Sequence, residues 1–379
     1  MSAVTPDATR PQPTNLVPVI RAIPEGRHAN PTWKGLAYLG RDLLIYGLAL
    51  WGLASTDNLL LLIPLWVLSA LAVAALFIVG HDAAHGALFK SRWLNSLVGH
   101  ICMLPAWHVY EGWVLGHNRL HHGYTVRQGL DFVWHPLEPE QYAALSPLAR
   151  LRHRLEWSRF GPGPYYAREV WWNKMMVGRP PARWASRIRR DRWIVAVFVL
   201  LSATALGLWG WLAADSALTG LWLFVKLFVV PFLLFTYVIG WVVHLHHIDP
   251  AIRWYTKKDW NKYRAQMEGT TVLHVPGWLD LFFHHIFIHV PHHVDQRIPF
   301  YELPAASNAI IAAFPGVVEE RPLRLGDFGR NTKQCKLYSF DEGRWYTYAE
   351  ARELLSAAAK PPASPRPAAC ASRAGSAPR

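Results

Sequence analysis

Cysteine is scarce in this sequence. Only Cys102, Cys335 and Cys370 are present, and no two of them have the CxxC spacing. The odd count and the missing pairs exclude a disulfide framework and a thiolate metal cluster as the organising feature. The first 34 residues also lack the basic-then-apolar layout of a secretory signal. We therefore expect membrane insertion, if it occurs, to depend on internal segments.

Acidic residues are few as well. Lys and Arg number 39 against 26 Asp and Glu, yet 52% of the residues are hydrophobic. Neither a nucleic-acid-binding domain nor an ordinary soluble enzyme has this combination, whereas apolar spans with basic flanks do. The 20 tryptophans agree, because indoles favour membrane interfaces. We expect an integral membrane protein that has no nucleic-acid partner.

Four segments have the length and apolarity of membrane-spanning helices, which need about 20 residues. They are Leu36–Ala54, Asn58–Gly80, Ile194–Ala214 and Leu221–Val243. In the first segment, Arg41 and Asp42 leave open whether it spans the membrane or lies in the interface. In the fourth segment, Lys226 is expected to snorkel to the headgroups.

The connections predict the orientation of the chain. Trp93–Leu115 is apolar but interrupted by Pro105, which indicates a segment in the membrane interface. The stretch from His117 to Arg192 is rich in arginine and is expected on the cytoplasmic side. An even number of spans separates His81 from His244–His247, so these histidines should lie on the same cytoplasmic face.

The two ends differ in composition from the middle. Residues 1–33 are polar and proline-bearing and are expected to form a disordered arm, and residues 357–379 are expected to form a disordered tail rich in Ala, Pro, Ser and Arg. Residues 34–350 are expected to form one membrane domain. Both termini are expected in the cytoplasm.

Three histidine clusters follow the apolar runs. They are HDAAH with His81 and His85, HNRLHH with His117, His121 and His122, and HVPHH with His289, His292 and His293. On a helix, residues i and i+4 share one face, and the third ring of each longer cluster stands about 100° round. A single pair would be a polar helix end, but three clusters indicate a metal site. Imidazole ligands suit iron, copper, zinc or nickel.

The three clusters resemble the histidine pattern of the membrane-bound fatty acid desaturase family, which is HxxxH or HxxxxH, then HxxHH or HxxxHH, then HxxHH. The segments GHDAAHGAL, GHNRLHHGYT and HHVDQRIPFYEL resemble the bacterial acyl-lipid branch related to the Δ12 enzymes. The resemblance covers about Leu36 to Tyr348. It implies an all-α integral membrane protein with about four transmembrane helices and a cytoplasmic helical cap that carries a histidine-rich di-iron site.

 The implied location is the bacterial inner membrane, with the active site facing the cytoplasm.

The family's ligands carry over residue by residue. The resemblance implies that iron is held by His81, His85, His117, His121, His122, His289, His292 and His293. It adds one histidine at the end of the fourth span, within HLHH, where we expect His247 and keep His246 as the alternative. Some relatives hold a metal-bound water with an asparagine one turn earlier, but that position is Val243 here.

Four residues are expected to support the ligands without binding metal. They are Asp82, Asp131, His246 and His285, whose role would be to orient ligand rings. For the two aspartates, helix capping or a surface salt bridge is an equally open interpretation.

The resemblance implies O2-dependent desaturation of a long-chain fatty acyl group by two iron ions. An unactivated C–H bond offers no acidic proton, so a metal must supply the oxidising power. The expected product is a double bond in a membrane lipid's acyl chain, which would reach the irons through a narrow apolar tunnel. No flavin, nicotinamide or fused cytochrome b5 motif is apparent, so we expect a separate electron donor such as ferredoxin or a similar carrier.

Two other functions fit part of the pattern. Membrane di-iron hydroxylases or ketolases acting on alkanes, fatty acids or carotenoids share the histidine scheme, although the stretch from Asp131 to Leu137 looks more like the acyl desaturases. A metal transport protein would instead need polar residues within its spans, and Asn58–Gly80 and Ile194–Ala214 offer almost none.

Overall fold

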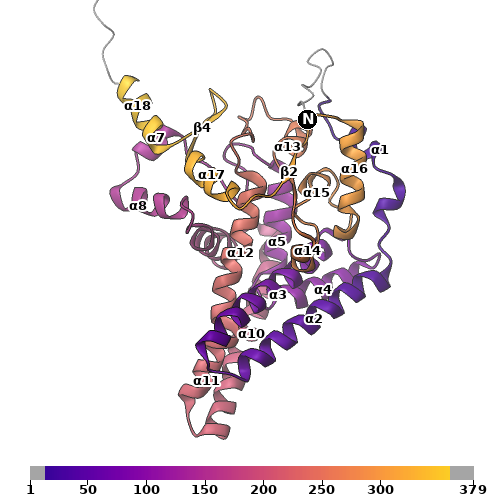
Figure 1. Cartoon of the computed structure of the whole chain (residues 1–379), viewed down its shortest axis with the longest axis vertical. Coiled ribbons are helices and arrows are strands. Elements are labelled where there is room, and N and C mark those ends of the chain that lie inside the picture. The colour runs from indigo at the N-terminus through magenta and orange to yellow at the C-terminus, as the bar shows by residue number, and fades with distance from the viewer. Residues whose placement is uncertain (1–12, 359–379) are drawn as a thin grey trace, which may run out of the picture.

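The computed structural model describes residues 13–358 and is built mainly of helices (Figure 1). Four helical stretches are long and apolar enough to cross a membrane, which confirms the predicted fold class. These are α2 (Thr32–Ala54), α3 (Leu59–His85), α10 (Ala182–Ala214) and the continuous run of α11 (Ala217–Phe224), η4 (Val225–Val229) and α12 (Val230–His247). They fill the lower half of Figure 1, and the remaining elements cap their upper ends.

The second span shows how the sequence sets a helix's limits. The Asn58 side chain accepts a hydrogen bond from the backbone N–H of Leu60 at 2.9 Å, which caps the start of α3. Gly86 ends the helix in the left-handed conformation, with φ of 71°, which glycine adopts without a steric penalty. The helix therefore continues past the apolar run and includes both histidines of HDAAH.

The charged residues of the spans are paired inside the protein. Lys226 is buried, and its Nζ donates to Asp57 Oδ1 at 2.7 Å and to the Thr56 carbonyl at 2.9 Å. The expectation that Lys226 snorkels to the headgroups is therefore wrong, because the turn between α2 and α3 supplies a nearer partner. Asp42 is likewise buried, and it accepts from Arg41 Nε at 2.9 Å.

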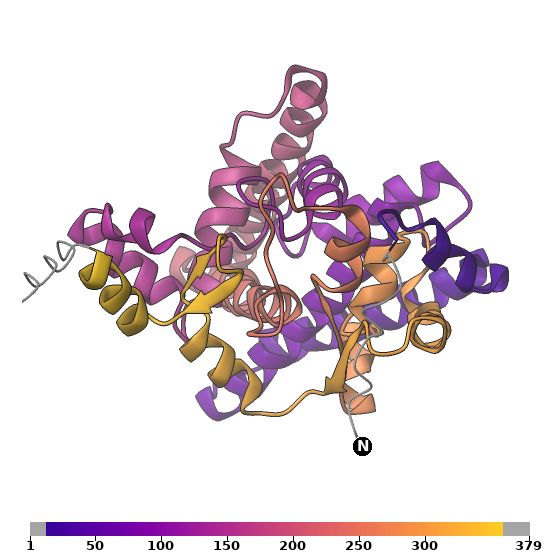
Figure 2. The ribbon, with the colours of Figure 1, turned by 90° about the horizontal axis from the view of Figure 1, so that it is seen from above.

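The cap consists of short helices and two small sheets, which Figure 2 shows from above. The helices between the second and third spans are α4 (Arg92–Met103), α5 (Tyr110–Trp113), η2 (Val114–His121), α6 (His122–Tyr124), α7 (Pro139–Ala143), α8 (Pro147–Glu156), α9 (Pro162–Tyr165) and η3 (Tyr166–Met176). Those after the fourth span are α13 (Lys262–Met267), α14 (Gly277–Phe283), α15 (His289–Val294), η5 (Phe300–Glu302), α16 (Leu303–Ala313), α17 (Asp327–Gln334) and α18 (Tyr348–Ala358).

Each sheet has two strands. Strand β1 (Thr271–His274) pairs in parallel with β2 (Glu319–Pro322), with Thr271 opposite Glu319. Strand β3 (Leu337–Ser339) pairs antiparallel with β4 (Arg344–Tyr346), with Leu337 opposite Tyr346. The first sheet joins segments of the cap that are distant in the chain, whereas the second is a local hairpin, and neither alters the all-α character of the membrane region.

The described part of the N-terminal arm differs from the expected disorder. It contains α1 (Val17–Ala22) and the 3₁₀ turn η1 (Glu25–His28). Leu16, Val19 and Ile23 are buried in a hydrophobic cluster shared with α3, α15 and α16, because their spacing places them on one helical face. Residues 1–12 and 359–379, which include nearly all of the expected tail, lie outside the described residues.

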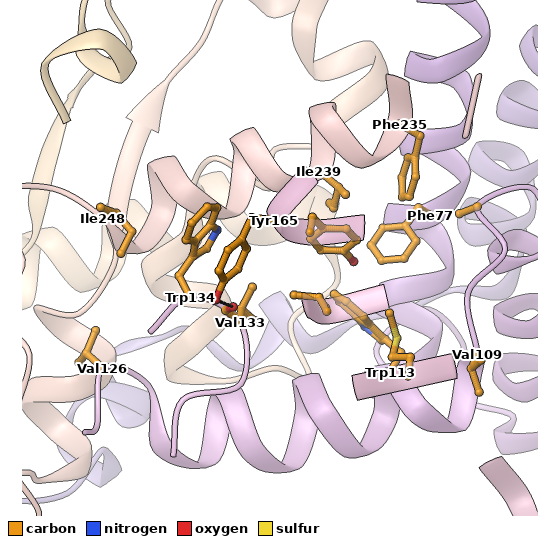
Figure 3. Packing of buried hydrophobic residues seen from close by; sticks show 14 of the residues in the cluster. Phe77, Val109, Trp113, Val126, Val133, Trp134, Tyr165, Phe235, Ile239 and Ile248 are labelled. Atoms are coloured by element: carbon orange, nitrogen blue, oxygen red, sulfur yellow. Dashed lines mark hydrogen bonds between the residues drawn. The ribbon is translucent and has the colours of Figure 1, made fainter. Parts of the chain in front are cut away.

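Two hydrophobic clusters hold the cap to the spans. In the first, Phe77 of α3 meets Trp113 of α5 and Phe235 of α12, with ring centroids 4.9 and 5.3 Å from that of Phe77 (Figure 3). Exposed side chains on α10 are largely apolar, such as Leu200 and Leu212, which fits lipid contact. The spans thus form a scaffold whose upper end carries the histidines.

Candidate metal centre

Eight histidines lie in two groups at the upper end of the spans. The first histidine group consists of His81, His85, His117 and His292, and the second consists of His121, His247, His289 and His293. Within each group, one ring nitrogen of every residue lies within 4.8 Å of the others, a spacing that can hold a metal ion. Seven of the eight residues are buried, and His85 is half-buried.

The π-helix η2 divides the second sequence cluster between the two groups. A π-helix places one more residue in each turn than an α-helix, so residues i and i+5 come close. His117 Nε2 lies 3.1 Å from His122 Nε2. His121 instead turns towards α12, where its Nε2 lies 3.2 Å from His247 Nε2. One short helix therefore supplies both groups.

The ring nitrogens face one another at short distances. His81 Nε2 lies 2.9 Å from His117 Nε2 and 3.3 Å from His85 Nε2. Both ring nitrogens of His292 are buried without a hydrogen-bond partner. Burying an unpaired polar atom is costly, and a metal ion bound by His292 would satisfy the lone pair of its neutral ring. The residues therefore fit a metal, and an all-imidazole donor set suits a transition metal better than magnesium or calcium.

Every ring of the second group has a partner on its outer nitrogen. His121 Nδ1 lies 2.8 Å from Asp131 Oδ1, and His293 Nδ1 lies 2.6 Å from Gln266 Oε1. The remaining partners are backbone carbonyls: Gly269 for His247 Nδ1 at 3.0 Å and Ile286 for His289 Nδ1 at 3.1 Å. Because each Nδ1 donates outward, each Nε2 is left with its lone pair towards the centre.

The first group has fewer outer partners. His85 Nδ1 lies 2.6 Å from Gln296 Oε1, and His81 Nδ1 lies 3.2 Å from Asp82 Oδ1. His117 Nδ1 and His292 Nδ1 are buried and have none. Asp82 also accepts the backbone N–H of Phe300 at 2.6 Å, so it links α3 to η5 as well as orienting a ring.

Burial keeps the histidines outside the spans neutral. Desolvation, followed by the neighbouring histidines, holds the pKa of His117, His289 and His292 well below the usual value of a histidine. A neutral ring is the form that binds metal. Burial acts to raise the pKa of Asp131, but His121 and the backbone N–H of Val126 outweigh it and lower that pKa. Asp131 thus remains an acceptor for His121.

Three of the histidines predicted for the site lie outside the two groups. His122 sits between them, with its ring stacked 4.3 Å from that of His293 and its centroid 4.9 Å from that of His85. His246 stacks on His289 at 3.9 Å and is buried. His285 does not join the centre: its Nδ1 pairs with Asp280 Oδ2 at 3.0 Å, because the left-handed turn at the end of α14 directs it there.

Sequence reasoning missed both supporting glutamines. Gln266 holds His293, and its Nε2 also donates to the His122 carbonyl at 2.8 Å. Gln296 holds His85 across more than two hundred residues of chain. The nearness of Gln296 to HVPHH was a weak signal, whereas nothing in the sequence marks Gln266.

A narrow cavity of about 30 Å³ reaches both groups from the membrane side. Its apolar walls include Phe77 and Ile78 of α3 and Ile239 of α12, and Figure 3 shows Phe77 and Ile239 in this region. His81, His121 and His289 line its other end. The cavity is small, so these side chains pack closely around the two groups.

Fold and site together define a class: a helical membrane protein with two buried histidine groups, each able to hold a metal ion, at one end of its spans. The comparisons identify the family within this class. The fatty acid desaturase family model matches residues 57–321, and the chain belongs to this family. The expectation of an oxidoreductase that desaturates fatty acyl groups is thereby confirmed.

Individual relatives match most of the chain. The sn-1 oleoyl-lipid 12-desaturase of Anabaena variabilis is 30% identical over 333 residues, covering 86% of this chain and 90% of the relative. The sn-1 acyl-lipid omega-3 desaturase (ferredoxin) of Nostoc sp. is 30% identical over 82% of this chain and 84% of its own length. The 12-desaturase of Synechocystis sp. is 29% identical over 73% of this chain and 76% of its own length.

Proposed function

We propose that this protein is an acyl-lipid desaturase that uses O2 and two iron ions to form a double bond in a long fatty acyl chain of a membrane lipid. The observation that carries the proposal is the pair of buried histidine groups at one end of apolar spans. The relatives named as acting on oleoyl-lipid and acyl-lipid support the lipid-borne substrate.

The proposed ligands are nine histidines. They are His81, His85, His117, His121, His122, His247, His289, His292 and His293. We assign His122 to the metal centre because its ring lies between the two groups. His246 stays a supporting residue, since it stacks on His289 and belongs to neither group. When bound, iron supplies the oxidising power that removal of hydrogen from an unactivated methylene requires.

The chain's own residues position the substrate and exclude water. Phe77 and Ile239 contribute apolar walls from the second and fourth spans, which suits two neighbouring methylenes of an acyl chain. The hydrogens removed from these methylenes leave with reduced oxygen as water. Because the cavity is narrow in the absence of substrate, we infer that an acyl chain enters by displacing side chains such as Ile239.

A separate electron donor is part of the proposal. The name of the Nostoc relative, which includes ferredoxin, supports a ferredoxin-type carrier. Trp260 offers an entry point for electrons, because hydrogen bonds connect it to His121. Its Nε1 donates to the Thr125 carbonyl at 2.9 Å, and Thr125 Oγ1 donates to the His121 carbonyl at 2.7 Å. Lys257 and Lys258 are exposed beside Trp260 and would attract an acidic partner.

The proposed orientation places the metal centre and both termini in the cytoplasm of a bacterium, with the spans in its inner membrane. Arginines support it, because short cytoplasmic connections carry an excess of basic residues. Four exposed arginines lie at the end of α10 that adjoins the cap, namely Arg183, Arg187, Arg189 and Arg190. The connections at the other end, near Asp57 and Asp215, carry no Lys or Arg.

The test is expression in a bacterium that lacks polyunsaturated lipids, together with a ferredoxin and its reductase. Fatty acids are then analysed by gas chromatography with location of the double bond. New dienes at one position are the expected result, and the His292→Ala variant is the matched control without product. Hydroxylated chains would instead indicate a hydroxylase, and an unchanged profile from well-inserted protein would contradict the proposal.

A further inference from the structure

Helix α8 presents an unpartnered apolar stripe. Leu148, Leu151 and Leu155 are 76%, 54% and 61% exposed. At 100° per residue, their spacing places them within an arc of about 60° on one face of the helix. His153 and Glu156 are buried on the opposite face, so the stripe points away from the protein. Such a stripe on a helix surface is the signature of a partner or a membrane.

Basic residues border this stripe. Arg152 and Arg154 stand on either side of the leucines around the helix, and both are exposed. Glu156, the one carboxylate of α8, is buried and accepts from Arg168 Nη2 at 2.9 Å. The outer face of α8 therefore combines apolar and positively charged groups and presents no negative charge.

A cavity of about 610 Å³ lies beside the segment that follows α8 in the chain. Its lining includes Arg159, Phe160, Tyr237, Leu325 and Lys333. Phe160 is 75% exposed, and the Leu325 side chain is fully exposed. Within residues 13–358, neither Arg159 nor Lys333 forms a salt bridge with an acidic residue. The cavity thus joins apolar walls to two basic groups that have no acidic partner.

The contact with α12 places this surface beside a membrane span. The Tyr237 hydroxyl donates to the Arg159 carbonyl at 2.7 Å, and a Cβ added to Gly163 would lie 3.0 Å from the Tyr237 Cα. Tyr237 belongs to the fourth span, in the half nearer to His247. Arg159 and the neighbouring Phe160 therefore adjoin the part of this span that leads to the histidine groups.

We propose that α8 and the adjoining cavity form a docking site for an anionic phospholipid of the cytoplasmic leaflet. The three leucines and Phe160 enter the acyl region, and Arg152, Arg159 and Lys333 contact the headgroup phosphate. Figure 1 shows α8 lying across the direction of α12, as a helix in the membrane plane does. A second copy of this chain would fit less well, because the same face would bring arginine against arginine.

The first experiment measures whether the stripe enters lipid. The full chain, with Cys370→Ser and Leu151→Cys, is labelled with an environment-sensitive fluorophore; Cys102 and Cys335 are buried. It is placed in phosphatidylcholine vesicles containing increasing fractions of phosphatidylglycerol. A blue shift that grows with phosphatidylglycerol is expected. The matched control is Ser356→Cys, which is exposed on α18, farther from the spans in Figure 1, and should stay in water.

The second experiment tests the basic groups. Arg159→Gln and Lys333→Gln should each raise the phosphatidylglycerol fraction required for the shift about fivefold, whereas Arg352→Gln on α18 should not change it. An emission from Leu151→Cys that equals the Ser356→Cys control at every composition would overturn the proposal. So would a shift that follows the protein-to-lipid ratio with cross-linking between copies, or one reproduced by soluble glycerol phosphate alone.

Discussion

The two histidine groups differ in how firmly the protein holds them. All four rings of the second group have an acceptor on the outer nitrogen, and two of these acceptors are backbone carbonyls. Only two rings of the first group have one, and His117 and His292 have none. Outer partners fix the tautomer and orientation of a ligand ring. The protein alone therefore fixes the ring orientations of the second group, whereas the rings of the first group are less constrained.

The difference follows from where the groups lie. The second group is assembled from η2, α12 and α15, where loop carbonyls such as that of Gly269 end close to the rings. The first group takes His81 and His85 from α3, whose own backbone carbonyls are used within the helix, so their outer partners are the side chains of Asp82 and Gln296. Its two unpartnered rings, His117 and His292, come from η2 and α15, which also serve the second group. The difference therefore lies in the surroundings of each ring and not in the helix that carries it.

The largest effect is expected from removing a proposed ligand of the second group. His121→Ala should abolish product and lower bound iron by about half, because a centre missing one imidazole loses its geometry. Gas chromatography measures the product, and elemental analysis of purified protein measures the iron. His274→Ala is the control, since that exposed ring pairs with Glu320 on the surface. Activity retained by His121→Ala would count against its assignment.

The next largest effects are expected from replacing the two aspartates that contact the histidine rings, and these effects should differ between the two groups. Asp131→Asn is expected to lower activity or metal affinity about 10- to 100-fold. Asp82→Asn should cost less metal affinity, because Asp82 lies farther from its histidine, at 3.2 Å compared with 2.8 Å. Iron titration of the two variants measures the difference. Equal losses, or a larger loss in Asp82→Asn, would contradict the ranking of the groups.

Metal removal should expose the same asymmetry. On treatment with a chelator, iron is expected to leave in two phases, and the faster phase should belong to the first group, which has the half-buried His85. His85→Ala should remove the fast phase and keep the slow one. A single phase in the unaltered protein would mean that the two groups hold metal equally well.

The smallest effects are expected from the glutamines. Gln296→Ala and Gln266→Ala each remove one neutral hydrogen bond to the ring of a proposed ligand, worth about 1 kcal/mol, which corresponds to about a fivefold loss of metal affinity. Gln296→Ala should act on the fast phase of iron release and Gln266→Ala on the slow phase. If each variant altered the other phase, the assignment of the groups would have to be reversed.

Much of this arrangement could be predicted from the sequence, because local patterns carry it. The apolar runs predicted four spans, and the three clusters predicted histidines gathered at one end. The partners of Lys226 and His293 could not be predicted, since they come from segments that are distant in the chain. The helix α1 was missed because its short apolar stripe has meaning only against the surface that covers it.

The wide turn of η2 has a consequence for engineering. His117 and His122 are neighbours because this helix counts five residues to the next aligned position, and His121 faces the other group for the same reason. In an ordinary α-helix His121, at i+4, would align with His117 in place of His122, although no histidine had changed. The same histidine motif placed in a regular helix would therefore keep its sequence but would no longer divide its rings between the two groups in this way.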